Sequence, residues 1–214
     1  MDNKQANVER FNAKAAEWDD DPKRVRMGQG VAQAMLDALQ PSGREQALEF
    51  GAGTGILTTL MAPRLARVTA LDSSSGMLGV LRRKCADSHL ANVDAVEGSV
   101  PEQLPDQRFD LVYSSMTLHH VEDVPGLLRA LADHVQPGGH VALADLDVED
   151  GGFHREAQGV VHHGFAREAV DRWLRDAGFD DVRFSTAYTM QREGARGATR
   201  DYPIFLTVAR KPEH

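Results

Sequence analysis

Histidines and carboxylates gather in two stretches of the 214-residue sequence. The first stretch, SSMTLHHVED, contains His119 and His120, and the second, ADLDVEDGGFHREAQGVVHHGF, runs from residue 144 to residue 165. An imidazole beside a carboxylate can remove a proton from a hydroxyl, thiol or amine, and the same groups can also bind a metal ion. These two stretches are therefore the first candidates for chemistry.

The second stretch allows three interpretations. Its spacing matches no compact metal-ligand motif, and the adjacent His162 and His163 cannot easily bind one ion from a helix, so we predict no metal site. A proton-transfer pair is the second interpretation, with Asp145 or Asp147 beside His154 or His162. The third is a polar loop in which DVEDGG turns the chain and His163 helps to position the following helix. The sequence does not choose between the last two.

A glycine-rich loop, GAGTG, follows the apolar segment ALEF and contains Gly51, Gly53 and Gly55. Glycine is needed where the backbone turns sharply or where a ligand approaches more closely than a Cβ permits. Asp72 ends the next apolar segment, where a carboxylate can accept hydrogen bonds from both hydroxyls of a ribose. Glu49 precedes the loop and would repel a pyrophosphate but attract an ammonium or sulfonium cation. The pattern therefore favours S-adenosylmethionine over a nicotinamide dinucleotide.

The elements that position these residues alternate between apolar bursts and helical patterns, which is typical of a parallel sheet with crossover helices. Two helices are expected in the first 40 residues, the first of them running through Phe11 to Trp18. Another is expected over VPGLLRALADHVQPGG, with Leu127, Leu128, Leu131 and Val135 on its apolar face. No helix separates the last two strands, which predicts an antiparallel hairpin through REGARG. The seven expected strands are 47–50, 66–72, 92–98, 108–115, 140–147, 180–188 and 202–210.

Composition limits the possible partners. The formal net charge of −8 argues against nucleic acid, and no apolar run approaches the roughly 20 residues of a membrane span. The N-terminus has no secretory pattern, and the single cysteine, Cys85, suits a reducing cytoplasm. We therefore expect a cytoplasmic protein, a monomer or homodimer, that acts on a small molecule without nucleic acid or membrane.

The segments LEFGAGTG, ALDSSSGML, FDLVYSSMTLHHVED and PGGHVALAD resemble those of the class I S-adenosylmethionine-dependent methyltransferases. The resemblance runs from about residue 45 to the C-terminus. It implies a Rossmann-like α/β fold with a seven-stranded sheet, helices on both faces, and a seventh strand antiparallel beside the sixth. FNAKAAEWDDDPKRVR resembles the N-terminal entry of small-molecule members. The implied organisation is a helical cap over residues 1–40 and an S-adenosylmethionine-binding methyltransferase domain over residues 41–214.

The resemblance also assigns roles to individual residues. Asp72 would bind the ribose hydroxyls, and Lys14 or Arg26 would reach the carboxylate of the cofactor. Ser99 stands where many relatives place an aspartate for the adenine amino group, which implies a weaker contact. The residues implied around the cofactor are Trp18, Glu49, Gly51, Ala52, Gly53, Gly55, Asp72, Ser73, Met77, Ser99, Val100, Ser114 and Thr117. The candidates for proton transfer are His119, Asp145, His154 and His162.

The implied activity is methyl transfer from S-adenosylmethionine to an oxygen, nitrogen or sulfur nucleophile of a small molecule. Carbon methylation of the kind found in quinone biosynthesis is an alternative within the same family. A non-catalytic, regulatory S-adenosylmethionine-binding protein is an alternative from another class. The intact glycine loop, Glu49 and Asp72 argue against that last alternative.

Overall fold

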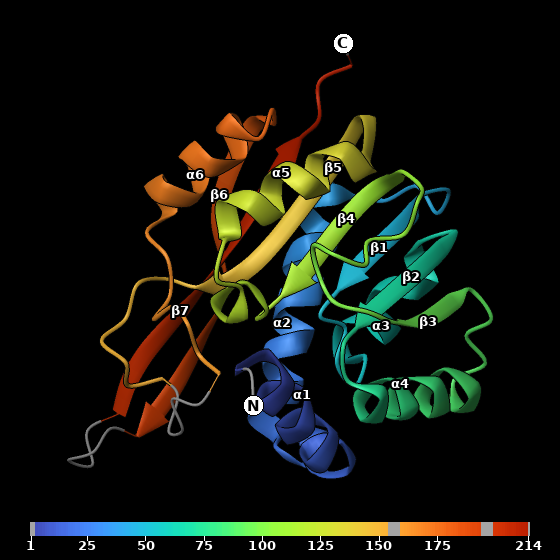
Figure 1. The fold of residues 1–214 in the computed structure, drawn as a ribbon, viewed down its shortest axis with the longest axis vertical. Coiled ribbons are helices and arrows are strands. Elements are labelled where there is room, and N and C mark those ends of the chain that lie inside the picture. The colour runs from blue at the N-terminus through green and yellow to red at the C-terminus, as the bar shows by residue number, and fades with distance from the viewer. Residues whose placement is uncertain (1–2, 154–158, 194–198, 214) are drawn as a thin grey trace.

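A twisted seven-stranded sheet forms the centre of the computed structural model, which describes residues 3–153, 159–193 and 199–213 (Figure 1). The strand order is β3-β2-β1-β4-β5-β7-β6; β1 to β5 pair in parallel, and β7 is antiparallel to both β5 and β6. The predicted fold class is thus confirmed. The strands are β1 (Gln46–Phe50), β2 (Arg67–Asp72), β3 (Val93–Glu97), β4 (Phe109–Ser115), β5 (Val135–Leu146), β6 (Asp180–Glu193) and β7 (Thr199–Arg210).

Helices cover both faces of the sheet and bury two separate apolar clusters (Figure 1). The α2, α3 and α4 side chains pack in one cluster, and those of α5 and α6 in the other. No helix among the described residues is long and apolar enough to cross a bilayer. The helices are α1 (Asn3–Lys14), η1 (Ala15–Asp20), α2 (Pro22–Leu39), α3 (Ile56–Met61), η2 (Ala62–Arg64), α4 (Ser75–Asp87), η3 (Leu118–His120), α5 (Val124–His134) and α6 (Arg167–Asp176).

The alternation of side chains along β1 puts a carboxyl group inside the protein. Ala47 packs in the cluster under α2 and α3, whereas Leu48 and Phe50 pack in the cluster under α5. Because successive side chains of a strand point to opposite faces, Glu49 lies on the same side as Ala47. The Glu49 side chain is almost fully buried there. Helices cover both faces of this parallel part of the sheet, so the Glu49 side chain would be buried on either face.

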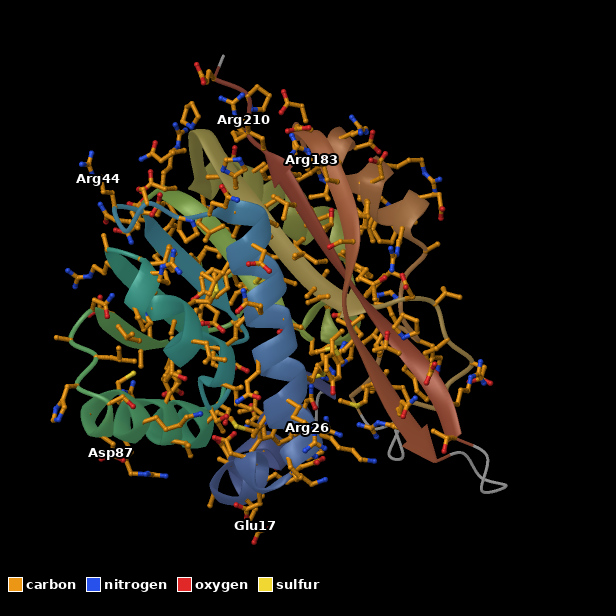
Figure 2. All side chains as sticks on the ribbon, turned by 180° about the vertical axis from the view of Figure 1, so that it is seen from behind. Glu17, Arg26, Arg44, Asp87, Arg183 and Arg210 are labelled. Atoms are coloured by element: carbon orange, nitrogen blue, oxygen red, sulfur yellow. The ribbon has the colours of Figure 1, made fainter. Side chains whose placement is uncertain are left out.

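Two glycines let α2 lie close against the body of the protein, which it crosses in Figure 2. A Cβ at Gly28 would lie 2.4 Å from Cγ2 of Ile56, and one at Gly30 would lie 2.6 Å from the ring of Tyr188. The helix begins after Asp21, whose side chain accepts a hydrogen bond from the backbone N–H of Lys23. Thus α2 belongs to the layer on the sheet, whereas α1 and η1 lie at the end of the molecule near α4 (Figure 1).

Two local expectations were wrong. Trp18 lies in the 3-10 turn η1 rather than on the helix of Phe11, because α1 ends at Lys14. Val135 begins β5 rather than ending α5: it pairs with Phe109, and the next paired residue, His140, lies opposite Leu111. The four residues between Val135 and His140 bulge out of the ladder, so the Pro-Gly-Gly turn lies inside the strand region.

Candidate active site

A cavity of about 740 Å³ opens at the carboxyl edge of the parallel strands. The loops after β1, β2 and β3, the residues directly after β4 and the start of α2 line one half. The other half is lined by α1, the end of the loop after β4, Phe153 and the distal part of β6. The strand order reverses between β1 and β4, and ligands of open α/β sheets bind at such a point. We refer below to these as the cofactor half and the acceptor half.

The glycine loop forms the floor of the cofactor half. Gly51, Gly53 and Gly55 all have positive φ angles, of 67°, 56° and 78°, which L side chains rarely adopt. A Cβ at Gly51 would lie 2.2 Å from Oγ1 of Thr117, and one at Gly55 would lie 2.2 Å from Leu81. A Cβ at Gly53, in contrast, meets no described atom within 4 Å. Gly51 and Gly55 are therefore required by packing, and Gly53 leaves open space toward the cavity.

Asp72 stands at the end of β2 and fixes the shape of this loop. Its Oδ2 accepts a hydrogen bond of 2.8 Å from the Gly53 backbone N–H, and its Oδ1 accepts one of 2.8 Å from the Ser74 N–H. Burial raises the pKa of the Asp72 carboxyl above its ordinary value, although these backbone donors offset part of the effect. The carboxyl lines the cavity. Its remaining acceptor capacity is suited to hydroxyl donors from a ligand.

Glu49 lies under the glycine loop. Burial raises the pKa of the Glu49 carboxyl to about 8, and the hydroxyls of Thr58 and Tyr113 offset only part of this effect. The Oε2 atom has no hydrogen-bond partner among the described residues. A buried carboxylate is unfavourable unless it is paired. A ligand cation beside Glu49 would supply that missing partner.

Most of the cofactor residues named from the sequence line this cavity. They are Trp18, Glu49, Gly51, Ala52, Gly53, Asp72, Ser73, Met77, Ser99, Val100 and Thr117. Gly55 does not line it and instead caps α3. The placement of Ser114 in the cavity wall was wrong: its hydroxyl is buried and donates a 2.7 Å hydrogen bond to the Phe50 carbonyl. Its neighbour Ser115 lines the cavity, because alternate residues of β4 face opposite sides.

Polar contacts that the sequence did not reveal hold α1 and η1 over the cavity. Oδ1 of Asn12 accepts hydrogen bonds from the Ser74 hydroxyl and the Gly76 N–H, at 2.7 and 2.9 Å. Asp19 accepts a hydrogen bond from Thr54 at 2.6 Å and pairs with Lys84 at 2.8 Å. The sequence pattern assigned no contact to Asn12 or Asp19. These contacts could have been predicted only by knowing that η1 lies beside α4.

Trp18 and its neighbours form the adjoining part of the cavity wall. The guanidinium of Arg24 lies 4.1 Å from the centroid of the Trp18 ring and donates a hydrogen bond to its carbonyl. The Phe11 and Trp18 rings meet edge to face at 5.5 Å, although they lie on different helical segments. Lys14 lines the cavity. Arg26, labelled in Figure 2, is exposed and is not among the described residues that line the cavity.

A buried histidine–aspartate pair forms the border between the two halves. Nδ1 of His119 donates a 2.8 Å hydrogen bond to Oδ1 of Asp145, and the backbone N–H of His119 donates to Oδ2 at 3.2 Å. Burial alone would raise the pKa of Asp145, but His119 and the backbone N–H groups of Leu146 and His119 hold it below its ordinary value. His119 lines the cavity, whereas Asp145 lies behind it with no exposed surface.

His120 differs from its neighbour in its protonation. Its Nδ1 atom lies 2.6 Å from the Gly159 carbonyl, which can only accept, so Nδ1 carries the proton. Burial, and then the charge of His119, lower the pKa of His120 to about 4. The ring is therefore neutral at pH 7, and its Nε2 is a hydrogen-bond acceptor. His120 also lines the cavity, and its ring meets Phe11 edge to face at 5.6 Å.

The remaining histidines of the second stretch have structural partners. Nε2 of His162 donates a 2.9 Å hydrogen bond to the Val121 carbonyl, and His162 is not among the described residues that line the cavity. Its predicted position facing an acceptor was therefore wrong. His163 lies 3.4 Å from Glu149. His154 lies outside the described residues.

Backbone pairing explains why His162 and His163 are in these positions. The N–H of Glu149 donates to the His163 carbonyl at 2.9 Å, and the N–H of Val161 donates to the His119 carbonyl at 2.9 Å. Residues 159–165 thus join the loop after β4 to the loop after β5. Asp147 forms two hydrogen bonds with Arg167, at 2.8 and 2.7 Å. We call residues 147–149 and 159–165 the clasp, which is hydrogen-bonded to the backbone of His119 and to the ring of His120.

The sheet order, the glycine loop at the switch point and the acidic end of β2 define a Rossmann-like α/β protein with a nucleoside-type cofactor site. Residues 13–184 match a family described as "Methyltransferase domain". The match covers more than half of the sequence. The chain therefore belongs to this methyltransferase family, within the class I S-adenosylmethionine-dependent methyltransferases, and its cofactor is S-adenosylmethionine.

Relatives and solved structures agree with this membership. A ubiquinone biosynthesis O-methyltransferase from Xanthomonas axonopodis pv. citri is 30% identical over 230 residues, which cover 97% of this chain and 95% of that protein. An uncharacterized methyltransferase of Mycobacterium tuberculosis is 31% identical over 147 residues, which cover 67% of this chain and 73% of that one. The DhpI–SAH complex superimposes with a TM-score of 0.75 at 22% identity, covering 98% of this chain and 97% of that chain, and shares the fold.

The residues of the cofactor half fit S-adenosylmethionine. Its positively charged groups suit the buried Glu49, whose Oε2 has no partner among the described residues. The open side of Gly53 leaves room for close approach to the backbone. Asp72 presents a carboxyl to the cavity at the end of β2, where a ribose is expected.

Proposed function

We propose that this protein transfers a methyl group from S-adenosylmethionine to an oxygen, nitrogen or sulfur atom of a small molecule, and that His119 removes the proton of that atom. The observation that carries the proposal is the 2.8 Å bond between His119 and the buried Asp145 at the cavity wall. The bound cofactor supplies an electrophilic methyl group. The protein must therefore orient the nucleophile and accept its proton.

The cofactor half would hold the cofactor through the residues that line it. Glu49, Gly51, Ala52 and Gly53 are proposed for the methionyl part, and Asp72 for the ribose hydroxyls. Ser73, Met77, Ser99 and Val100 are proposed for the ribose and adenine, with Thr117 and Trp18 closing the site. Gly55 acts by shaping the loop. We propose that α1 and η1 are the part of the predicted cap that covers this half.

Asp145 prepares His119 for proton transfer. Because Nδ1 of His119 donates to Asp145, the proton-free nitrogen of the neutral ring is Nε2. The carboxylate fixes this tautomer and stabilises the imidazolium that forms when Nε2 accepts a proton. Hydrogen bonds from the backbone N–H groups of His119 and Leu146 keep Asp145 in place and ionised. Asp145 is thus a positioning residue, and His119 is the proposed catalytic base.

His120 is a less suitable base because its pKa is about 4. A base is most efficient when its pKa lies near the working pH. Its neutral Nε2 can instead accept a hydrogen bond from the acceptor and orient the reacting atom. The two adjacent histidines would then divide the work, with His120 orienting the nucleophile and His119 taking its proton.

Oxygen is the nucleophile that we favour. The Xanthomonas axonopodis relative, which this chain matches over 95% of that protein's length, is named an O-methyltransferase. A phenolic hydroxyl has a pKa near 10 and needs a base at neutral pH. We further propose a cytoplasmic monomer or homodimer that does not bind nucleic acid, in keeping with the net charge of −8 and the single cysteine.

A methyl-transfer screen tests the proposal. Purified protein is incubated with labelled S-adenosylmethionine and a panel of phenols, thiols and amines, and methylated products are identified by mass spectrometry. We expect turnover of at least one acceptor by the wild type and a large loss in His119→Gln. Isothermal titration should give equal cofactor affinity for both proteins. Binding of the cofactor without turnover of any compound, or full activity in His119→Gln, would overturn the assignment of His119.

A further inference from the structure

We propose that the methyl acceptor carries an anionic group, a carboxylate or a phosphate-type oxyanion, which Arg10 and Arg192 bind in the acceptor half. This inference rests on the proposed function of the cavity, and it adds the chemical class of the substrate. Both arginines line the cavity, one from α1 and the other from the distal part of β6.

Aromatic contacts connect Arg10 to the proposed base. Its guanidinium carbon lies 4.9 Å from the centroid of the Phe11 ring. The Phe11 ring lies 5.6 Å from the His120 ring, which in turn lies 4.2 Å from the His119 ring. The charge of Arg10 is also felt at His120, where it contributes to lowering the pKa of the imidazole. An anion on Arg10 would therefore place the rest of the same small molecule beside the two histidines.

Arg10 has hydrogen-bonding capacity that the described residues do not use. Its Nη2 donates a 2.9 Å hydrogen bond to Oδ1 of Asn7, a neutral group. Its Nε atom is buried and has no hydrogen-bond partner among the described residues. A buried N–H group without an acceptor is unfavourable by the cost of its lost hydration. An oxyanion in the cavity supplies that acceptor, and the planar guanidinium fits it with two parallel bonds.

Arg192 supplies a second charge on the β6 side of the acceptor half. Its guanidinium carbon lies 4.2 Å from the centroid of the Phe153 ring, and its Nε lies 3.4 Å from Sδ of Met190. Phe153 and Met190 are buried and line the same cavity. These apolar side chains hold the stem of Arg192 against the cavity wall and reduce the competition of water for its charged head.

The carboxylates that line the cavity belong to other contacts. Asp72 and Glu49 lie around the glycine loop in the cofactor half. Asp21 caps α2 and lies 3.8 Å from Arg24. No other described Asp or Glu lines the cavity. A protein with a net charge of −8 thus presents two guanidinium groups where the acceptor would bind.

The cofactor has its own carboxylate, so a competing explanation is that the arginines bind that group. Three other cations line the cavity from the end of α1 and the start of α2: Lys14, Lys23 and Arg24. Of these, Arg24 lies over the Trp18 ring. The cation beside Trp18 is the better candidate for the cofactor, because Trp18 belongs to the cap that lies over the glycine loop. Arg10 and Arg192 lie instead with Phe11, Phe153 and the histidines.

Isothermal titration of the protein saturated with S-adenosylhomocysteine tests the inference without requiring turnover. The probes are benzoate, phenylphosphonate and the neutral benzamide. We expect at least one anion to bind at least tenfold more tightly than benzamide, and the comparison of the two anions decides between a carboxylate and a phosphate-type group. Arg10→Gln and Arg192→Gln should each weaken anion binding about tenfold and leave the affinity for S-adenosylhomocysteine unchanged.

Arg44→Gln is the matched control, because Arg44 is exposed and lies far from Arg26 and the cap (Figure 2). It should bind the anions like the wild type. Equal binding of benzamide and both anions would overturn the inference, as would a loss of cofactor affinity in Arg10→Gln that matches its loss of anion binding. The methyl-transfer screen separates the two proposals: turnover of neutral acceptors alone leaves the proposed function standing and refutes the anionic acceptor.

Discussion

The cofactor half and the acceptor half of the cavity are built in different ways. The cofactor half consists of turns that directly follow strands, such as the glycine loop after β1 and Asp72 at the end of β2. The acceptor half combines α1, the loop after β4, the clasp behind it and the distal part of β6. The first is encoded by short continuous segments, whereas the second exists only when distant segments fold together.

The two halves also differ in charge. The cofactor half contains the carboxyl groups of Glu49 and Asp72, which suit a cationic cofactor. The acceptor half contains Arg10 and Arg192 together with the neutral ring of His120. The cationic cofactor would therefore lie beside carboxyl groups, and an acceptor with an anionic group would lie beside arginines. The border between the halves, at His119, is where the proton must leave.

The largest effect is expected at that border. His119→Gln should lower kcat by about 10²- to 10⁴-fold, because general bases contribute this much and glutamine cannot accept the proton. The Kd of S-adenosylmethionine should stay within twofold of the wild-type value. Steady-state kinetics with the acceptor found in the screen, together with isothermal titration, measure both quantities.

Asp145→Asn is the matched variant for His119. It keeps the size of the side chain but favours the wrong tautomer of His119, so kcat should fall while cofactor binding is retained. An unchanged kcat in both variants would mean that the border between the halves does not carry the proton transfer.

The contrast between the halves also explains what the sequence could predict. Glu49, Gly53 and Asp72, which the sequence singled out, all line the cavity, because each stands at or just after the end of a strand. The His119–Asp145 pair was missed, since the sequence paired Asp145 or Asp147 with His154 or His162 instead. A signal did exist: β4 and β5 are parallel neighbours, with Ser115 opposite Ala144, so the residues just after each must meet.

The other failures have a similar cause. Ser114 was predicted to lie on the face of β4 that lines the cavity, but its neighbour Ser115 is on that face. The contacts of Asn12 and Asp19 join α1 and η1 to α4, and a polar residue on a predicted helix does not identify its partner. Arg10 and Arg192 carry no motif, and 182 sequence positions separate them. Tertiary packing, rather than local pattern, determines these parts of the acceptor half.

A second prediction concerns the cofactor half alone. Asp72→Ala should raise the Kd of S-adenosylmethionine by about 10- to 100-fold, because two hydrogen bonds to a charged acceptor are lost. Anion binding in the acceptor half, measured with benzoate, should change much less. Thermal unfolding serves as the control, since Asp72 also holds the N–H groups of Gly53 and Ser74. Equal losses at both halves would show that the halves are not independent.

Glu49 gives the cofactor half a pH dependence. Without cofactor its pKa is about 8, against an ordinary value of 4.5. If the cation of the cofactor needs the ionised carboxylate, binding near pH 7 must release this proton. The Kd should then rise about fivefold when the pH falls from 8 to 7. Calorimetric titration in two buffers of different ionisation enthalpy measures the number of protons released on binding. The amino group of the cofactor can also release a proton, so the difference between the wild type and Glu49→Gln gives the contribution of Glu49.

The same shift has a consequence for stability. The native protein without cofactor keeps a proton on Glu49 that the unfolded chain gives up above its ordinary pKa of 4.5. The contribution of Glu49 to stability therefore falls as the pH rises from 4.5 through 8. Glu49→Gln should consequently raise the Tm at pH 9 and change it little at pH 4. A Tm difference that is independent of pH would show that Glu49 is already ionised in the empty site.

The smallest effect is expected in the clasp, behind the acceptor half. His162→Phe removes the hydrogen bond to the Val121 carbonyl and should lower the free energy of unfolding by about 1 kcal/mol. Because His162 does not line the cavity, kcat at saturating cofactor should change less than twofold. His162→Gln keeps a donor and should recover part of the stability. A hundredfold loss of kcat with unchanged stability would instead make His162 part of the chemistry, and the border between the halves would then extend beyond His119 into the clasp.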